Sequence, residues 1–86
     1  MNINDLIAIV KKKLKKEIVI QVLKIEDKSF LHKNHKGHRE GKFHLKLIIK
    51  SDELTKSSKI ISTKKIYSIL DLELKEYIHS IQILLN

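Results

Sequence analysis

The chain has 86 residues, enough for one small domain but too few for two hydrophobic cores. It contains no cysteine, which excludes disulfides and thiolate ligands, so a metal bound by this chain alone must be held by histidine, carboxylate or backbone groups. Its 18 Lys and Arg against 10 Asp and Glu give a net charge of +8, and this positive potential favours nucleic acid, acidic protein or anionic lipid as partners.

Several classes of protein are not expected. No apolar run approaches the roughly 20 residues of a membrane span, and the first residues lack the basic-then-apolar order of a secretory signal. There is no P-loop and no G-x-G-x-x-G motif, and no serine has a base and an orienting acid at a recognisable spacing. The sequence therefore predicts a soluble, cytoplasmic protein that is not an enzyme and does not insert into a membrane.

The first predicted element is an amphipathic helix over residues 3–16. Apolar residues recur there at spacings of three and four, Asn2 or Asn4 is available as the N-cap, and Asp5 suits the positive end of the helix dipole. The outer face carries five lysines: Lys11, Lys12, Lys13, Lys15 and Lys16. A solvated face is the more frequent meaning of such a run, and an electrostatic binding patch is the alternative.

Two strands are predicted next, over residues 18–26 and 43–51. Both segments are rich in branched apolar residues that alternate with polar ones. The connection over residues 28–43 is much longer than the two to five residues usual in a hairpin, and such loops are more often functional than structural. The residues expected to face the core are Val19, Leu23 and Ile25 in the first strand and Leu45, Leu47 and Ile49 in the second.

From residue 57 to 77 the apolar period returns to that of a helix, either one helix or two with a break near Asp71. Residues 79–85 are predicted to form a last strand. The expected buried face contains Ile60, Tyr67, Leu70, Leu74 and Tyr77 or Ile78, and the expected outward residues are Lys59, Lys64, Lys65 and Glu73. This order of elements predicts a single α+β domain over residues 1–86, with helices covering one face of a small sheet.

Four of the five histidines lie in or beside the long connection. His32, His35 and His38 are three residues apart, but Gly37 and Gly41 disfavour a helix that would bring their rings together. In an irregular loop the three imidazoles would still be able to converge on a borderline metal such as zinc. No further ligand is placed to complete a tetrahedral site, so solvated histidines are the more frequent alternative.

The segments EDKSFLHKNHKGH, HLKLIIKSDEL, SSKIISTKKIYSIL and LELKEYIHSIQI resemble the BolA family, in the family's own order and over nearly the whole chain. The family pattern Asp-x-Ser-x-x-His falls on Asp27, Ser29 and His32. The histidine that begins the family's second strand falls on His44, and the C-terminal Ile-His-Ser-Ile falls on residues 78–81. The resemblance implies an αββαβ fold similar to class II KH domains, with a three-stranded mixed sheet and a short helical turn before the main second helix.

The chain departs from the family's pattern in three places. Leu54 stands where the family has phenylalanine, residues 56–58 replace a Gly-Lys/Arg-Ser turn, and residues 62–64 replace Arg-His-Arg on the second helix. These changes affect the geometry of the turn and remove a helix histidine that would contact nucleic acid. Lys64 and Lys65 keep the basic character of that helix.

The resemblance implies a specific function without enzymatic activity. BolA-like proteins partner monothiol glutaredoxins of the Cys-Gly-Phe-Ser type, and the pair can hold a [2Fe-2S] cluster for which the glutaredoxin and a glutathione supply thiolates. The BolA-like chain would supply His79 and His32, with His35 or His38 as alternates, and His44 is expected at the strand surface or behind the ligands. Imidazole in place of thiolate on one iron gives an electronically distinct cluster, as in Rieske-type ligation. The expected role is iron–sulfur cluster handling or iron and redox signalling.

The resemblance also supports a second function, because bacterial family members are described as DNA-binding transcriptional regulators in stress response and cell morphology. Lys59, Lys64 and Lys65 are the candidate phosphate contacts. An RNA-binding KH-like module is a third alternative, although Gly37 and Gly41 are too far apart for the G-x-x-G clamp. A homodimer is compatible with the sequence, which does not fix the oligomeric state.

Overall fold

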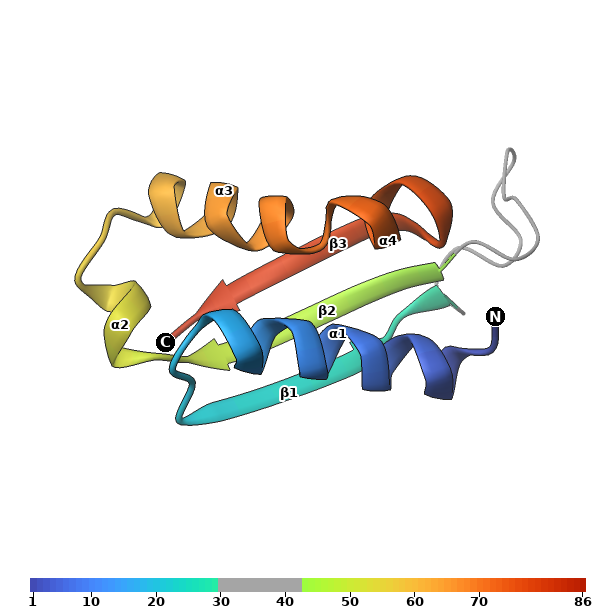
Figure 1. Cartoon of the computed structure of the whole chain (residues 1–86), viewed down its shortest axis with the longest axis horizontal. Helices are drawn as coiled ribbons and strands as arrows, with labels where there is room; N and C mark the ends of the chain where they lie inside the picture. Colours follow the sequence, from blue (N-terminus) through green and yellow to red (C-terminus); the bar gives the residue numbers. More distant parts are fainter. Residues whose placement is uncertain (30–42) are drawn as a thin grey trace.

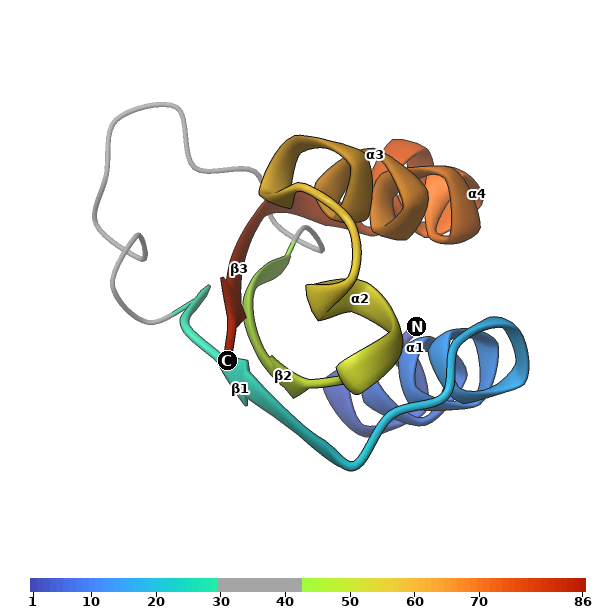
Figure 2. The same cartoon turned by 90° about the vertical axis from the view of Figure 1, so that its left-hand side faces the viewer.

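A computed structural model describes residues 1–29 and 43–86 of the chain. The strands form one sheet, and the helices lie on one side of it, as Figures 1 and 2 show from two directions. The predicted α+β fold, the three-stranded mixed sheet and the short helix before the main second helix are confirmed. In chain order the elements are α1 (Ile3–Glu17), β1 (Val22–Asp27), β2 (Phe43–Lys50), α2 (Asp52–Thr55), α3 (Lys59–Ile69), α4 (Asp71–Glu76) and β3 (Ile78–Leu85).

The sheet has the order β1-β2-β3, with β2 antiparallel to β1 and parallel to β3. Two parallel neighbours need a long crossover connection, and the chain supplies it through α2, α3 and α4. The end of β1 therefore lies beside the starts of β2 and β3. We call this region the histidine end, and it consists of Asp27, Ser29, His44, His79 and Ser80.

The first helix matches its prediction, and Asn2 is the residue that caps it. The Asn2 Oδ1 accepts a hydrogen bond from the Asp5 backbone N–H at 2.8 Å. The first strand is shorter than predicted, because it begins at Val22 rather than at residue 18. Val19 lies in the connection and is 65% exposed, so the expectation that it faces the core is wrong.

The core lies between the helices and the sheet, and the buried apolar side chains of the described residues are all aliphatic, with Phe43 and Tyr77 packed at the margin. Burying one such side chain completely stabilises the fold by about 1.5–3 kcal/mol. The alternation predicted for β2 is confirmed on its core side, where every second residue is buried. The buried apolar residues are Leu6, Val10, Leu14, Ile18, Leu45, Leu47, Ile49, Leu54, Ile66, Leu70 and Ile78. Among the helices that the structure describes, none combines the length and apolar composition needed to cross a bilayer.

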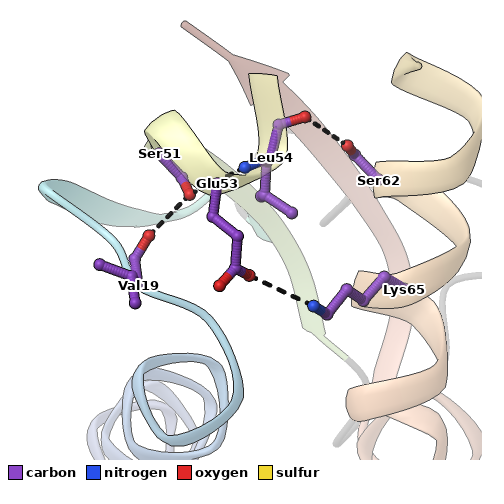
Figure 3. Close-up of polar contacts among 6 residues, drawn as sticks. All are labelled: Val19, Ser51, Glu53, Leu54, Ser62 and Lys65. Carbon is purple, nitrogen blue, oxygen red and sulfur yellow. Dashed lines mark hydrogen bonds and ion pairs between the residues drawn. The ribbon is translucent and has the colours of Figure 1, made fainter. Parts of the chain in front are cut away.

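Of the two alternatives for this region, two helices with a break near Asp71 are observed. The predicted buried face is correct at Leu70 and Ile78, but it is wrong at Ile60, which is 69% exposed, and at Tyr67, which is 44% exposed. Ser62 and Ile66 are buried in α3, and with Leu70 they are spaced by four. A serine can occupy the first of these positions because its Oγ donates a hydrogen bond to the Leu54 carbonyl oxygen at 2.9 Å, as Figure 3 shows.

The expectation that Glu73 points outward is also wrong. Glu73 is only 2% exposed, and its Oε2 accepts a hydrogen bond from the Lys13 Nζ at 2.7 Å. Helix α3 ends and α4 begins at Leu70, and Glu73 in the first turn of α4 contacts Lys13 of α1. The Glu73 Oε1 is buried without a hydrogen-bond partner, so the carboxylate depends on Lys13 for compensation of its charge.

Serine side chains build the end of the sheet opposite to the histidine end (Figure 3). The Ser51 Oγ donates to the Val19 carbonyl oxygen at 2.7 Å and accepts from the Leu54 N–H at 3.2 Å. Ser58 caps α3, since its Oγ accepts from the Ile61 N–H at 3.2 Å. We call this region, Ser51, Leu54, Ser58 and Ser62, the serine end. Its hydroxyls make hydrogen bonds with backbone groups of Leu54 and Ile61, in the region where the chain departs from the family's pattern.

Candidate functional site

His79 lies at the start of β3 and is exposed. Phe43 pairs with Ile78 and His44 pairs with Ser80, so the ladder is irregular where His79 stands. Irregularities of this kind turn one side chain away from the regular alternation of a strand. The ring of His79 has its centroid 5.0 Å from that of His44, and the two ring planes are inclined by 55°. The histidine end therefore presents one exposed imidazole beside a second one.

His44 is buried, with 6% of its surface exposed, so the expectation of a strand-surface histidine is wrong and its alternative, a place behind His79, fits. Its Nδ1 lies 2.6 Å from the Ser80 Oγ, and the tautomer decides which atom donates. The two residues are partners in the β2–β3 register, so their side chains share a face of the sheet. Because Ser80 occupies Nδ1, a metal bound by His44 would have to use Nε2.

The Asp-x-Ser part of the family motif fixes the backbone around His44. The Asp27 Oδ1 accepts from the Ser29 N–H at 2.9 Å, and the Ser29 Oγ accepts from the His44 N–H at 3.1 Å. The Lys28 N–H donates to the His44 carbonyl oxygen at 2.7 Å. The short polar side chains of Asp27 and Ser29 thus tie the residues that follow β1 to the first residues of β2.

The loop histidines predicted as ligands, His32, His35 and His38, lie outside the described residues. The structure therefore places His79 but does not test its pairing with His32. Within residues 1–29 and 43–86, no group of three or more His, Cys, Asp or Glu side chains is arranged to hold a metal ion. The imidazoles that the described chain brings together at this end are those of His44 and His79.

A hollow of about 320 Å³ lies on the open face of the sheet beside His44. Lys28 and Lys46 line it together with Ser80 and Gln82. The Lys28 Nζ is 3.9 Å from the Glu26 Oε2, so part of the lysine charge is compensated. The remaining positive charge favours an anionic partner at this position.

The three lysines predicted to contact nucleic acid all lie on α3, but they do not form one face. Residues five apart and one apart on a helix point in different directions, so Lys59, Lys64 and Lys65 spread around its axis. All three are exposed. The Lys65 Nζ is 3.2 Å from the Glu53 Oε2, as Figure 3 shows, so this lysine is already paired within the chain.

Comparison with known proteins agrees with this fold. The family model described as BolA-like protein matches residues 14–86. The chain belongs to the BolA-like family. The BolA-like fold also aligns with the solved BolA domain of SufE1 from Arabidopsis thaliana, with a TM-score of 0.77, 32% identity, and coverage of 92% of this chain and 87% of that one.

Two further solved structures resemble the BolA-like chain. BolA1 from Arabidopsis thaliana aligns with a TM-score of 0.76 and 26% identity, covering 92% of this chain and 87% of that one. A bol-like protein from Babesia bovis, with a TM-score of 0.70 and 18% identity over 91% of this chain and 79% of that one, shares the fold. The comparison with curated protein sequences gives no match.

The sequence predicts His79 as a site residue, and this stays a prediction; the contact between His44 and Ser80 was missed. The signal was present in the alternation of the BolA-like strands, because both residues lie on the face opposite to the core residues of their strands. Only the register between β2 and β3 shows that they are direct neighbours. That register depends on the irregularity at His79, which no pattern of alternating residues predicts.

Proposed function

We propose that this BolA-like chain is a non-enzymatic partner of a monothiol glutaredoxin of the Cys-Gly-Phe-Ser type. The two proteins share a [2Fe-2S] cluster in iron–sulfur cluster handling or in iron and redox signalling. The observation that carries the proposal is the exposed imidazole of His79, supported by the buried ring of His44, in a chain that has no thiolate of its own. The glutaredoxin and a glutathione supply the sulfur ligands.

The donor chemistry of the histidine end fits such a cluster. A neutral imidazole is an accepted ligand for one iron of a [2Fe-2S] centre. His79 would hold the cluster, with His32, or His35 or His38 in its place, as the second ligand from this chain. A bound cluster supplies one-electron redox chemistry and transferable iron and sulfide.

The neighbours of His79 prepare it for this role. The ring of His44 fills the space on one side of His79, and the bond to Ser80 holds His44 in one orientation. Lys28 and Lys46 lie in the hollow beside the ring of His44, where positive charge suits a thiolate-ligated cluster and the carboxylates of glutathione. The histidine end thus offers too few ligands to hold a cluster alone, and Lys28 and Lys46 give it positive charge. Both features suit a cluster that is shared with a second protein.

An anaerobic titration tests the proposal. Cluster-loaded monothiol glutaredoxin is mixed with this chain, and the visible absorption and circular dichroism of the cluster are recorded. We expect a changed spectrum with the native chain and with Ser68→Ala, a control because Ser68 is exposed on α3 and does not line the hollow beside His44. His79→Ala should abolish the change. An unchanged spectrum, or an equal change with His79→Ala, would contradict the proposal.

Single replacements in the loop then identify the second ligand. We compare His32→Ala, His35→Ala and His38→Ala in the same titration. If His32 is the ligand, only His32→Ala should alter the spectrum of the shared cluster. An effect of His35→Ala or His38→Ala alone would assign the ligand to that residue instead.

A second candidate function is DNA binding through the helix layer. The helices α1 and α3, which both carry exposed lysines, lie on the same side of the sheet (Figure 2), in a chain of net charge +8. Contacts with phosphate make affinity fall steeply with salt, and base contacts are needed for sequence preference. The test compares unrelated duplexes across a salt series. Equal affinity for all of them would reduce this function to charge attraction.

A further inference from the structure

The two edge strands of the sheet differ in charge. The edge strand β1 carries Lys24, Glu26 and Asp27 among its six residues, whereas β3 has no charged residue among eight. Residues 77–86 are the longest stretch of the sequence without Asp, Glu, Lys or Arg. Proteins usually protect an open edge with charges, prolines or bulges, because its free N–H and C=O groups pair readily with another strand. The β3 edge lacks charge and proline over its whole length, and the irregularity at His79 leaves the ladder regular from Ser80 to Leu85.

The backbone of β3 is available along that edge. The Asn86 N–H donates to the Ile49 carbonyl oxygen at 2.9 Å, which sets the phase of the parallel ladder. Alternate residues of an edge strand bond to the neighbouring strand, so Leu84 and Gln82 face β2, and Ile81 and Ile83 direct their N–H and C=O groups outward. In the part of the chain that the structure describes, no strand pairs with this edge.

The side chains of β3 also stop short of full burial. Ile81 and Ile83 stand in register with Leu45 and Leu47 of β2, which are 2% and 0% exposed. Ile81 and Ile83 are only partly buried, although they face the same core. On the other face Leu84 is 43% exposed. The rows of apolar side chains thus continue into solvent at β3, and one more strand would cover them.

We propose that this edge pairs with β3 of a second copy of the chain, antiparallel across a two-fold axis, to form a continuous six-stranded sheet. An acidic or basic peptide finds no complementary charge on β3, whereas a second copy of β3 is itself uncharged and offers the same row of apolar side chains. Two bodies of net charge +8 repel one another, and their contact is least opposed where neither carries charge. The same strand then serves both sides of an isologous interface.

The pairing has a natural centre at Gln82. With the two-fold axis there, Ile81 faces Ile83 of the second copy and Ser80 faces Leu84 of the second copy. The partly buried isoleucines gain a cross-strand neighbour on the core side. The proposal goes beyond the cluster-sharing function and does not depend on it.

Sedimentation velocity over a range of concentrations tests this dimer. One pair of strands makes a small interface, so we expect a weak monomer–dimer equilibrium. Gln82→Lys places two lysines opposite one another at the centre and should weaken association about tenfold. The matched control is Val22→Lys on the β1 edge, where the residue is 53% exposed. Each new lysine has a lysine in register on β2, Lys46 or Lys50, so both variants place two like charges side by side within the monomer.

A spin label locates the contact independently. Because the native chain has no cysteine, Gln82→Cys provides a single attachment point. Directly opposed positions of two strands should give an intermolecular distance below about 25 Å between the nitroxides. A monomer at every concentration, equal weakening by Val22→Lys, an open-ended series of oligomers, or a longer distance would each overturn the proposal.

Discussion

The two ends of the sheet are both built with serine, yet they use its hydroxyl differently. At the serine end, Ser51 and Ser62 are each 1% exposed, and their hydroxyls bond to backbone groups of Val19 and Leu54. At the histidine end, the Ser80 hydroxyl bonds to the ring of His44, beside the exposed ring of His79. The hydroxyls of Ser51 and Ser62 stabilise the fold by bonding to backbone groups, whereas the hydroxyl of Ser80 fixes the orientation of the His44 ring.

This difference separates stability from function. Replacing a buried hydroxyl that serves the backbone leaves polar groups unsatisfied and lowers the free energy of unfolding. Replacing the exposed imidazole of His79 removes the proposed ligand and leaves the core unchanged. Variants at the serine end should therefore lower the free energy of unfolding and leave the histidine site intact. Variants at the histidine end should alter that site and change the free energy of unfolding less.

The largest effect is expected from Ser51→Ala. The change removes two hydrogen bonds and leaves the Val19 carbonyl and the Leu54 N–H without their partner. We expect a loss of about 2–3 kcal/mol in the free energy of unfolding. For a domain of this size, that corresponds to a melting temperature lowered by about 10–20 °C. Thermal and urea denaturation measure the loss, and the exposed Ser57→Ala is the control.

Lys13→Met should have the next largest effect, and it probes the helix that leads into the histidine end. The variant leaves the Glu73 carboxylate buried without its cation. Removing one partner of a fully buried pair costs about 3–5 kcal/mol, but 37% of the Lys13 side chain is exposed and water screens the pair. We therefore expect a loss of about 1–2 kcal/mol by urea denaturation. The exposed Lys12→Met should cost almost nothing, and equal losses would contradict a specific role of the ion pair.

Ser80→Ala should cost less stability and alter the site more. The His44 Nδ1 loses its partner at 2.6 Å, which we expect to cost about 1 kcal/mol in the free energy of unfolding. The ring of His44 should then populate its two tautomers differently, and the resonances of His79 should shift because the rings are in contact. Nitrogen NMR of the imidazoles measures both changes. Ser68→Ala, at an exposed serine of α3, should leave both rings unchanged.

The sequence predicted the elements of the fold well, because helix and strand periods are local properties. The two central predictions, an α+β order and a β2 strand with Leu45, Leu47 and Ile49 on the core side, are confirmed. The errors lie where tertiary contacts override the local pattern. Ser62 is buried in place of Ile60 because the Leu54 carbonyl accepts its hydroxyl.

The candidate site was predictable in part. His79 follows from the C-terminal motif, and its exposure at a strand start agrees with the expected role. The burial of His44 and its bond to Ser80 depend on strand register, which a single sequence does not fix. The buried Glu73 was missed for a similar reason, since its partner Lys13 is 60 residues away in the chain.

The smallest effects on stability are expected at the ion pair between Glu53 and Lys65. Its loss removes neither a serine hydroxyl nor a histidine ring, so it serves as a reference for the variants at the two ends of the sheet. Both side chains are about two-fifths exposed, so Lys65→Ala should change the free energy of unfolding by less than about 0.5 kcal/mol. DNA affinity provides the informative measurement. Glu53→Gln frees the charge of Lys65 and should strengthen DNA binding at low salt, whereas Lys65→Ala should weaken it. If both variants bind duplex DNA like the native chain across a salt series, α3 does not contact phosphate at this position, and the basic charge of the helix layer serves solvation alone.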